Sequence, residues 1–318
     1  MDTKNIDVII PTFHPDEKLD KLITRLNLQS VKPDNIIIIN TRDESKGKKK
    51  NTGREINVRN FGCYANVKII EIPKTEFDHG ATRNRAAKHS RADIMIFMTQ
   101  DAIPANKYLI EKLLKGFKDD DVAAVYARQT ADPSSGIVEA FTRNFNYGSR
   151  DLKKTREDIG KYGIKTYFCS NVCAAYRRDC FMEVNGFCEP VILNEDMLMG
   201  AHLIERGYAV YYASRARVIH SHKYTARQQF KRNFDIGVSQ KMNDDIFGDI
   251  RSEGEGVRLV LYTLAFLLSR KEYLKIPGLI WQSGWKYIGF FLGKHYNVLP
   301  DFLCRKFSMS PNFFNGKF

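Results

Sequence analysis

Three short groups of side chains in this sequence are of types that could carry out chemistry. Asp101 follows an apolar run, and Glu195 and Asp196 stand next to each other. A single serine separates His220 from His222. Carboxylates and imidazoles transfer protons in catalysis and also bind divalent cations. Each acid has a structural alternative, because acids at the start of a helix often cap it.

The elements that would position these groups follow from the spacing of the apolar residues. Short apolar runs predict strands, and helical spacing between them predicts helices, over strands 7–10, 36–39, 67–72, 94–98 and 122–127 and helices 15–30, 81–91 and 104–118. The uninterrupted isoleucines from 36 to 39 are typical of a strand that is covered on both faces of a parallel sheet. Asp101 then follows the carboxyl end of the fourth strand, where open α/β sheets bind their ligands.

The second half of the chain continues the α/β pattern less regularly. The apolar runs predict strands over 172–176, 208–213 and 217–220, with a helix over 196–206. The polar stretch 132–165 contains several glycines, and we expect it to be a mobile excursion over the site. From Thr225 onward the chain is predicted to be mainly helical.

The composition is that of a folded, basic protein. The 318 residues include 50 Lys+Arg and 37 Asp+Glu, a net charge of +13, and 43% are hydrophobic, which excludes disordered and collagen-like chains. Six cysteines form no CxxC pair, so we expect reduced thiols in a core. The basic residues are dispersed without a nucleic-acid-binding motif, so we expect no nucleic-acid partner. The turn from Pro11 to Pro15 lacks the glycines of a dinucleotide site, which disfavours an oxidoreductase.

The chain shows no secretory signal and no apolar stretch of the ~20 residues that a membrane span needs, so we expect a cytoplasmic protein. Residues 251–318 nevertheless hold ten of the Lys and Arg residues and four of the Asp and Glu residues, together with Trp281 and Trp285. Aromatic residues interleaved with lysines are expected of helices that lie in the interface of an anionic membrane. The alternative is a helical subdomain that packs on the rest of the chain or forms a homo-oligomer contact.

The order of these groups along an α/β chain resembles the inverting family-2 glycosyltransferases with a GT-A fold. The motifs that carry the resemblance are Val8 to Thr12, Ile36 to Asn40, Gly80 to Asn84, Gln100 to Ala102 and Asn194 to Asp196. The stretch from Glu76 to Asn84 is more closely similar to the bacterial rhamnosyltransferases, which use dTDP-L-rhamnose to build surface polysaccharides. The resemblance covers residues 6 to about 235. It implies a Rossmann-like nucleotide-sugar-binding GT-A domain, a mixed sheet flanked by helices, over 1–240, followed by a helical C-terminal region over 241–318.

The resemblance also implies roles for individual residues. It places the nucleotide sugar against Pro11, Thr12, Asn40, Asp78, His79, Arg83, Gln100 and Asp101. It makes Asp196 the general base and has Glu195 position the acceptor or support the loop. The second strand ends in Asn40-Thr41-Arg42 without the acid that relatives often have there, so Asp78 is expected to recognise the thymine ring. Arg83 and either Arg227 or Arg232 are expected to face the diphosphate.

The metal site implied by the resemblance departs from the family pattern. Relatives have two acids in a DxD motif, whereas this chain has Gln100-Asp101-Ala102 and so offers one carboxylate. By position, His220 resembles the family's metal histidine, and His222 is the fallback. One carboxylate, one histidine and phosphate oxygens suffice for Mg²⁺, and Mn²⁺ accepts an imidazole more readily.

The resemblance thus implies an inverting transfer of L-rhamnose from dTDP-β-L-rhamnose to a lipid-linked saccharide, assisted by Mg²⁺ or Mn²⁺. It implies a peripheral location at the inner face of the cell membrane. Two alternatives stay open at this point. The donor could be another nucleotide sugar such as a UDP-hexose, or the missing second acid could mark a catalytically inactive scaffold of the same fold.

Overall fold

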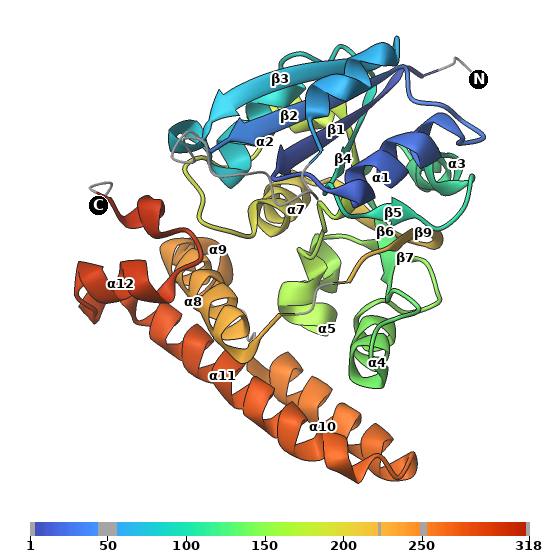
Figure 1. The fold of residues 1–318 in the computed structure, drawn as a ribbon. Helices are drawn as coiled ribbons and strands as arrows, with labels where there is room; N and C mark the ends of the chain where they lie inside the picture. The colour runs from blue at the N-terminus through green and yellow to red at the C-terminus, as the bar shows by residue number, and fades with distance from the viewer. Residues whose placement is uncertain (1–3, 44–55, 222–223, 249–252, 316–318) are drawn as a thin grey trace.

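A mixed β-sheet with helices on both faces forms the larger part of the structure (Figure 1). The computed structural model describes residues 4–43, 56–221, 224–248 and 253–315. The strands in chain order are β1 (Ile6–Phe13), β2 (Asn35–Arg42), β3 (Val67–Pro73), β4 (Ile94–Met98), β5 (Ile103–Pro104), β6 (Val122–Thr130), β7 (Leu152–Lys154), β8 (Cys173–Arg177) and β9 (Ala209–Ile219). Their order in the sheet is β3-β2-β1-β4-β8-β6-β9-β5, and β7 pairs with β9.

The first four strands in chain order pair with one another in parallel, as the sequence predicts. β8 is antiparallel to both β4 and β6, and β9 is parallel to β6. The helices of this part are α1 (Glu17–Asn27), α2 (His79–Ala87), α3 (Leu109–Leu114), α4 (Ile137–Asn146), α5 (Ile159–Tyr162), α6 (Arg178–Glu183) and α7 (Glu195–Glu205). The sheet is therefore mixed, and its parallel half presents four strand ends on one edge.

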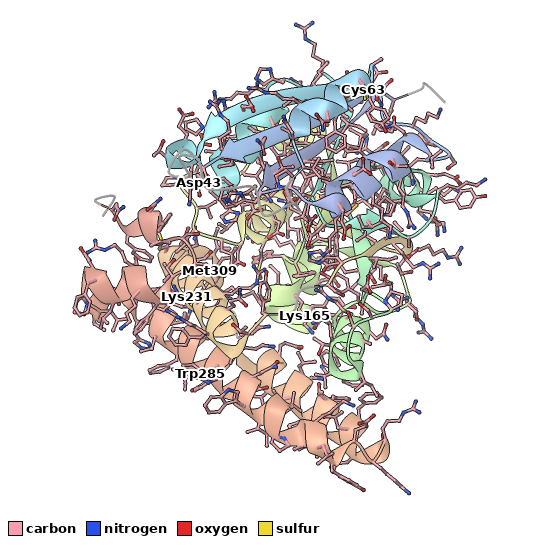
Figure 2. The ribbon with its side chains drawn as sticks, in the orientation of Figure 1. Asp43, Cys63, Lys165, Lys231, Trp285 and Met309 are labelled. Atoms are coloured by element: carbon pink, nitrogen blue, oxygen red, sulfur yellow. The ribbon has the colours of Figure 1, made fainter. Side chains whose placement is uncertain are left out.

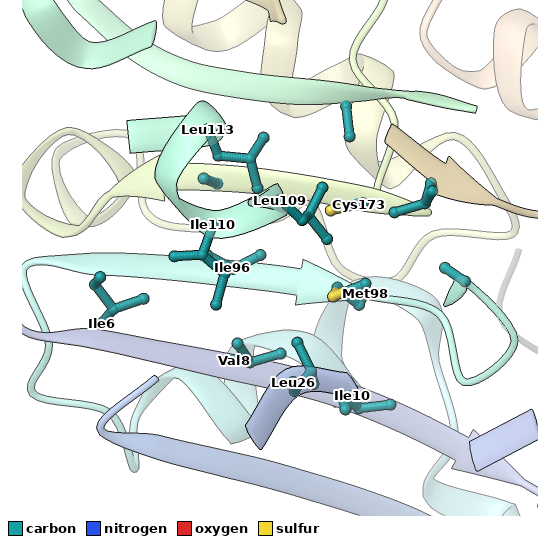
Figure 3. Close-up of a cluster of buried hydrophobic side chains, with 14 of the residues drawn as sticks. Ile6, Val8, Ile10, Leu26, Ile96, Met98, Leu109, Ile110, Leu113 and Cys173 are labelled. Atoms are coloured by element: carbon teal, nitrogen blue, oxygen red, sulfur yellow. The ribbon is translucent and has the colours of Figure 1, made fainter. Parts of the chain in front are cut away.

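Two hydrophobic clusters lie on opposite faces of the sheet. Ile36 and Ile38 belong to the cluster that also holds the apolar face of α1, and the close-up of that cluster shows Leu26 near Val8 (Figure 3). Ile37 and Ile39 belong to the other cluster. Successive side chains of a strand alternate between the faces, so four consecutive buried isoleucines require cover on both sides. The predicted doubly covered strand is confirmed.

Three local predictions are wrong. The expected helix 104–118 begins only at Leu109, because Ile103 and Pro104 form β5 and pair with the end of β9. The expected excursion 132–165 contains α4, α5 and β7, and β7 joins the sheet through β9. The two expected strands over 208–220 are one continuous strand, β9, whose exposed arginines alternate with buried apolar residues. Alternation of this kind is typical of a strand with one face in water.

The six cysteines form no disulfide, and four of them are buried. The prediction of thiols in the core fits those four. Cys63 is exposed, so the prediction is wrong for that residue. The remaining thiol, Cys188, is half-buried beside the ring of His202.

The C-terminal region is helical, as predicted, and is built on α8 (Ala226–Met242), α9 (Asp244–Phe247), α10 (Glu253–Ser269), α11 (Ile276–Lys294) and α12 (Asp301–Phe307). Helix α11 packs closely on α8 because glycines lie between them. A Cβ on Gly289 would stand 2.3 Å from the carbonyl oxygen of Phe230, and one on Gly293 would stand 2.1 Å from that of Phe234. The predicted domain boundary at residue 240 lies near the end of α8, which belongs with the C-terminal helices by its packing.

Further contacts join the C-terminal helices to the rest of the chain and to one another. The ring of Phe266 on α10 stacks on Phe141 of α4 at a centroid distance of 4.4 Å. After α12 the chain returns to α8, where Lys231 Nζ donates to the carbonyl of Ser308 and Asp235 accepts from the backbone N–H of Met309 (Figure 2). Among the described residues, no helix is long and apolar enough to span a membrane.

Candidate active site

The carboxyl ends of the parallel strands bring several predicted residues together. Thr12 and Asn40 are register partners on β1 and β2, and the Thr12 hydroxyl donates to Asn40 Oδ1 at 2.9 Å. Gln100 follows β4 and binds the backbone of Phe13 twice. It accepts from the Phe13 N–H at 2.9 Å and donates to the Phe13 carbonyl at 3.1 Å. Pro11 lies one residue before Thr12, so this edge joins four of the residues predicted to face a nucleotide.

Asp101 and His220 meet beside this edge. Asp101 Oδ1 lies 3.5 Å from His220 Nε2, and the two side chains are 15% and 5% exposed. The short strand β5 explains the contact, because it starts two residues after Asp101 and pairs Ile103 with Ile219 at the end of β9. The structure thus places the two predicted metal ligands side by side. The fallback, His222, lies outside the described residues.

The donor set of this pair fits a divalent cation. A carboxylate oxygen suits Mg²⁺ and Mn²⁺, and an imidazole nitrogen suits Mn²⁺ better. Within the described ranges no group of three or more His, Cys, Asp or Glu side chains could hold an ion. A cation here would therefore complete its coordination with water or with oxygens of a bound phosphate, as Mg²⁺ commonly does.

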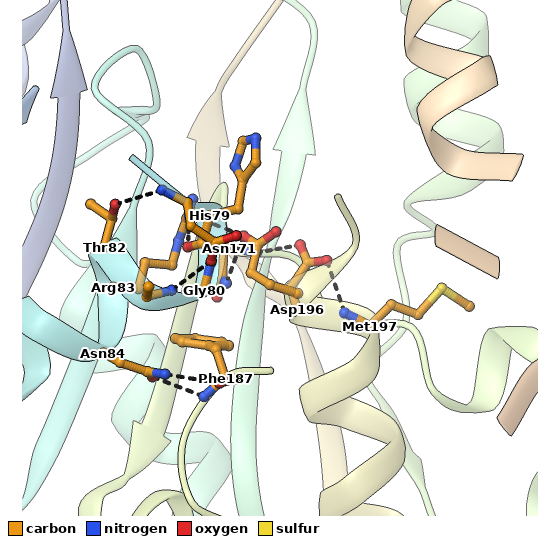
Figure 4. Close-up of polar contacts among 12 residues, drawn as sticks. His79, Gly80, Thr82, Arg83, Asn84, Asn171, Phe187, Asp196 and Met197 are labelled. Carbon is orange, nitrogen blue, oxygen red and sulfur yellow. Dashed lines mark hydrogen bonds and ion pairs between the residues drawn. The ribbon is translucent and has the colours of Figure 1, made fainter. Parts of the chain in front are cut away.

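The second group of the site is built around the start of α7 (Figure 4). Asn171, just before β8, donates its backbone N–H to Asp196 Oδ2 at 2.9 Å. Its side-chain amide donates to Glu195 Oε1 at 3.2 Å. The Arg83 guanidinium of α2 lies 3.2 Å from the same oxygen of Glu195, and both of these side chains are less than a tenth exposed. The structure thus brings together Arg83, Glu195 and Asp196, which the sequence analysis had assigned separate roles.

The surroundings drive the two carboxylates of this group in opposite directions. Burial, followed by the negative charge of Glu195, raises the pKa of Asp196 to about 7. Burial alone would also raise the pKa of Glu195, but the charges of Arg83 and His79 outweigh it, so the pKa of Glu195 is lowered. Neighbouring acids whose pKa values are pushed apart are typical of paired catalytic roles. Glu195 stays ionised while Asp196 can accept a proton near neutral pH.

Asp78 has a structural role that the sequence analysis did not predict. Its Oδ1 accepts from the backbone N–H groups of Gly80 and Ala81, which caps α2. Its Oδ2 accepts from the N–H of Val191 at 2.8 Å. The segment from Cys188 to Val191 can lie this close to the start of α2 only because residue 80 is a glycine. A Cβ on Gly80 would stand 1.9 Å from the carbonyl oxygen of Cys188. Recognition of a base by Asp78 stays a prediction.

Two of the candidate arginines, Arg83 and Arg232, act on His79. The His79 carbonyl accepts from Arg83 at 2.8 Å. Burial, the largest cause, lowers the pKa of the His79 ring even though the charge of Glu195 opposes the shift. The positive charge of Arg232 on α8 acts in the same direction as burial. This favours Arg232 over Arg227 as the second arginine of the site.

Three polar residues of the site escaped the sequence analysis. Asn171 holds both acids of α7, and Gln129 on β6 contacts His220 Nδ1 at 3.1 Å. Asp43, one residue beyond β2, lies 3.7 Å from His14 and 3.2 Å from Lys74 with 8% of its side chain exposed. Asp43 thus supplies an acid directly after the Asn40-Thr41-Arg42 end of the second strand. Asn171 and Gln129 left no local signal, since single amides occur throughout the sequence.

Comparisons with known proteins identify the family of the chain. Residues 7–184 match the family model described as glycosyl transferase family 2. The chain is 40% identical over 313 residues to the O-antigen chain rhamnosyltransferase RfbN of Salmonella typhimurium, with 98% of this chain and 96% of the relative covered. It is 39% identical over 312 residues to the O-antigen chain rhamnosyltransferase WbaN of Salmonella anatum, with 97% and 95% covered.

Solved structures show the same fold. The mannosyltransferase PcManGT from Pyrobaculum calidifontis, in complex with GDP-Man and Mn²⁺, superposes with a TM-score of 0.60 at 13% identity over 92% of this chain and 87% of that one. Residues 1–349 of S. aureus TarS superpose with a TM-score of 0.55 at 14% identity over 96% and 84%. These likenesses confirm the predicted mixed sheet flanked by helices with a C-terminal helical region.

Proposed function

The chain belongs to glycosyl transferase family 2 and is a glycosyltransferase of the O-antigen rhamnosyltransferase type, and from that premise we propose the donor, the mechanism and the place of action. We propose that it transfers L-rhamnose from dTDP-L-rhamnose, with inversion, to a lipid-linked saccharide in the synthesis of a surface polysaccharide. The observation that carries the donor is the 40% identity over nearly the full length to an O-antigen chain rhamnosyltransferase.

In the proposed mechanism, Asp196 is the general base. An inverting transfer needs one group that removes the acceptor hydroxyl proton while the oxygen attacks the anomeric carbon on the face opposite the leaving nucleotide. A base whose pKa lies near the working pH serves this purpose, and the pKa of Asp196 is raised to about 7. The Asn171 N–H and the Met197 N–H each hold one oxygen of this carboxylate and so fix its orientation. Glu195 keeps its negative charge and anchors Arg83 beside it.

The diphosphate end of the donor would lie at the strand edge with Asp101, Gln100, Thr12 and Asn40. Asp101 and His220 are the residues that would hold a divalent cation, Mg²⁺ or Mn²⁺. When bound, such a cation neutralises negative charge that develops on the departing nucleotide diphosphate. Arg83, which is paired with Glu195, and Arg232 are the arginines that we propose to face the diphosphate.

The donor is tested with purified protein, a panel of dTDP-, UDP- and GDP-sugars, and Mn²⁺ or Mg²⁺. Thermal shift identifies the bound nucleotide sugar, because a ligand that binds only the folded state raises the melting temperature. Mass spectrometry of a lipid-linked acceptor then detects a gain of one deoxyhexose, and NMR of the new linkage gives its anomeric configuration. A thermal shift with UDP-sugars alone would show that the donor is a UDP-sugar and not dTDP-L-rhamnose. No transfer with any donor would favour an inactive scaffold.

We further propose that α10 and α11 rest on an anionic membrane surface at the cytoplasmic face. On α11, Ile280, Trp281, Tyr287, Ile288 and Phe291 are each at least 47% exposed. Their spacing places them on the face of α11 opposite Gly289 and Gly293, which face α8. An exposed apolar stripe of this kind, on a region rich in lysine and arginine, suits a lipid interface.

Flotation with vesicles of phosphatidylglycerol and phosphatidylethanolamine tests this surface. Trp281→Glu and Phe291→Glu should each reduce flotation, because each places a charge within the apolar stripe. Leu28→Glu is the matched control, since Leu28 is 66% exposed at the end of α1, outside the C-terminal helices. Equal flotation of all three variants and the wild type would show that this face of α11 does not contact the membrane.

A further inference from the structure

A buried glutamine connects the candidate metal pair to the helix that follows β6. Gln129 is 3% exposed and has four polar contacts. Its side-chain nitrogen donates to the hydroxyls of Tyr147 and Ser170. Its side-chain oxygen accepts from the Arg143 guanidinium and faces His220 Nδ1 at 3.1 Å. Both ends of the amide are thus fully used.

The Arg143 contact determines which way the amide points. A guanidinium has donors only, so the Gln129 atom that faces it must be the oxygen and not the nitrogen. The same oxygen faces His220 Nδ1, and an acceptor oxygen can bind that nitrogen only if the nitrogen carries a proton. A neutral imidazole has one N–H, so the Nε2 of neutral His220 presents a lone pair.

The lone pair of His220 Nε2 lies close to the Asp101 carboxylate. His220 Nε2 lies 3.5 Å from Asp101 Oδ1, and His220 is 5% exposed. Two electron-rich atoms at this distance suit a site that holds a cation between or beside them. Metal-binding histidines in proteins commonly donate their other N–H to a carbonyl oxygen, which fixes the ring and its tautomer.

We propose that Gln129 is a positioning residue that holds His220 as the Nδ1–H tautomer and thereby presents Nε2 as a ligand for the cation bound with Asp101. The proposal rests on the metal site of the proposed function and adds the residue that prepares it. Arg143 takes part by fixing the orientation of the Gln129 amide. Because Arg143 and Tyr147 lie on α4 and just after it, the segment 132–165 contributes to the site through Gln129.

Three single variants of the full chain separate this role from ordinary packing. Gln129→Met keeps the length of the side chain but removes the acceptor for Nδ1. Gln129→Glu keeps an acceptor facing both Nδ1 and Arg143, and the hydroxyls of Tyr147 and Ser170 can donate to it. Tyr147→Phe disturbs the same buried network at the amide nitrogen and leaves the contact with His220 in place.

Two measurements are made on each variant without any sugar nucleotide. The first is the imidazole tautomer of His220 at about pH 8.5, from ¹⁵N shifts of protein labelled at histidine, with the His220→Gln variant assigning the signal. The second is the affinity for Mn²⁺ alone, from electron paramagnetic resonance of the free ion. Circular dichroism and the melting temperature confirm that each variant is folded.

We expect Nδ1–H in the wild type, in Gln129→Glu and in Tyr147→Phe, with Mn²⁺ affinities that differ by less than about threefold. Gln129→Met should lose the preference for Nδ1–H and bind Mn²⁺ about 10- to 100-fold more weakly. An Nε2–H wild type, or a Gln129→Met variant with unchanged tautomer and affinity, overturns the proposal. Wild type with Nδ1–H that binds no Mn²⁺ also overturns it, and the NMR result then shows that the failure lies in the metal site of the proposed function.

Discussion

Neutralising Glu195 should move the pH dependence of the reaction to lower pH. If Asp196 is the base, only its ionised form acts, and its pKa is raised to about 7 by burial and by the charge of Glu195. About a tenth of the sites are then ionised at pH 6 and about nine tenths at pH 8, so kcat/KM of the wild type should rise about tenfold over this interval. The Glu195→Gln variant loses the negative charge that repels ionised Asp196 and keeps the positive charge of Arg83. Both conditions favour the ionised form of Asp196.

The size of the shift follows from Coulomb's law. A unit charge about 6 Å away contributes about 3 kcal/mol at an effective dielectric constant of 20, which corresponds to about 2 pKa units. Rearrangement of the side chains reduces this, so we expect the acid limb to move down by about one to two pH units. The position of the limb is the result that matters, since the variant can also lower the maximal rate.

The assay is the initial rate of rhamnosyl transfer at subsaturating donor between pH 5 and pH 9. Glu205→Gln is the matched control, because Glu205 ends the same helix and its amide replacement keeps an acceptor for the Tyr167 hydroxyl. Its limb should coincide with that of the wild type. Asp196→Asn should lose about 10²- to 10⁴-fold in kcat/KM at every pH. A limb that stays in place in Glu195→Gln, or an Asp196→Asn variant with wild-type rates, would refute the assignment of the base.

Three further predictions concern stability. Arg83→Met leaves the Glu195 carboxylate buried without its cation. The variant should lose about 3–5 kcal/mol of unfolding free energy at pH 8, as measured by urea denaturation. The loss should be smaller at pH 5, where Glu195 can take up a proton. Gly293→Val places a side chain against the backbone of α8 and should lower the melting temperature, whereas Gly284→Ala, which faces open space, should leave it nearly unchanged. Burial lowers the pKa of Lys154 to about 7. The unfolded chain therefore binds about half a proton more than the native state at pH 7 and nearly one more at pH 9. The wild type should become more stable relative to Lys154→Met by about 2 kcal/mol over that range. Equal urea midpoints for the pair at both pH values would contradict the buried neutral amine.

Much of the central sheet could be predicted from local sequence. The isoleucines of β2 require cover on both faces, and β4 has the bounds that its apolar run predicts. The start of α7 at Glu195 was also within one residue of the expected helix. These features depend on the properties of neighbouring residues in the chain, which a sequence displays directly.

Prediction failed where pairing between distant segments decided the structure. Ile103 and Pro104 were expected to begin a helix, but the end of β9 offers them backbone partners as a strand. β7 joins the sheet for the same reason, although its stretch is polar and glycine-containing. Such choices depend on which strand edge lies nearby, and this information is absent from a local window.

The sequence by itself determined the kinds of chemistry available, since it holds one acid after β4, an acidic pair and a histidine at a strand end, in an order that identified the family. Only the tertiary structure decided how these groups act on one another. The pairing of β5 with β9 brings Asp101 to His220, and Gln129 reaches that histidine across 91 residues of chain. The approach of α2 to α7 places Arg83 on Glu195. Charges and hydrogen bonds act over a few ångströms of space, whatever the separation along the chain, so the roles of these residues were settled by the fold.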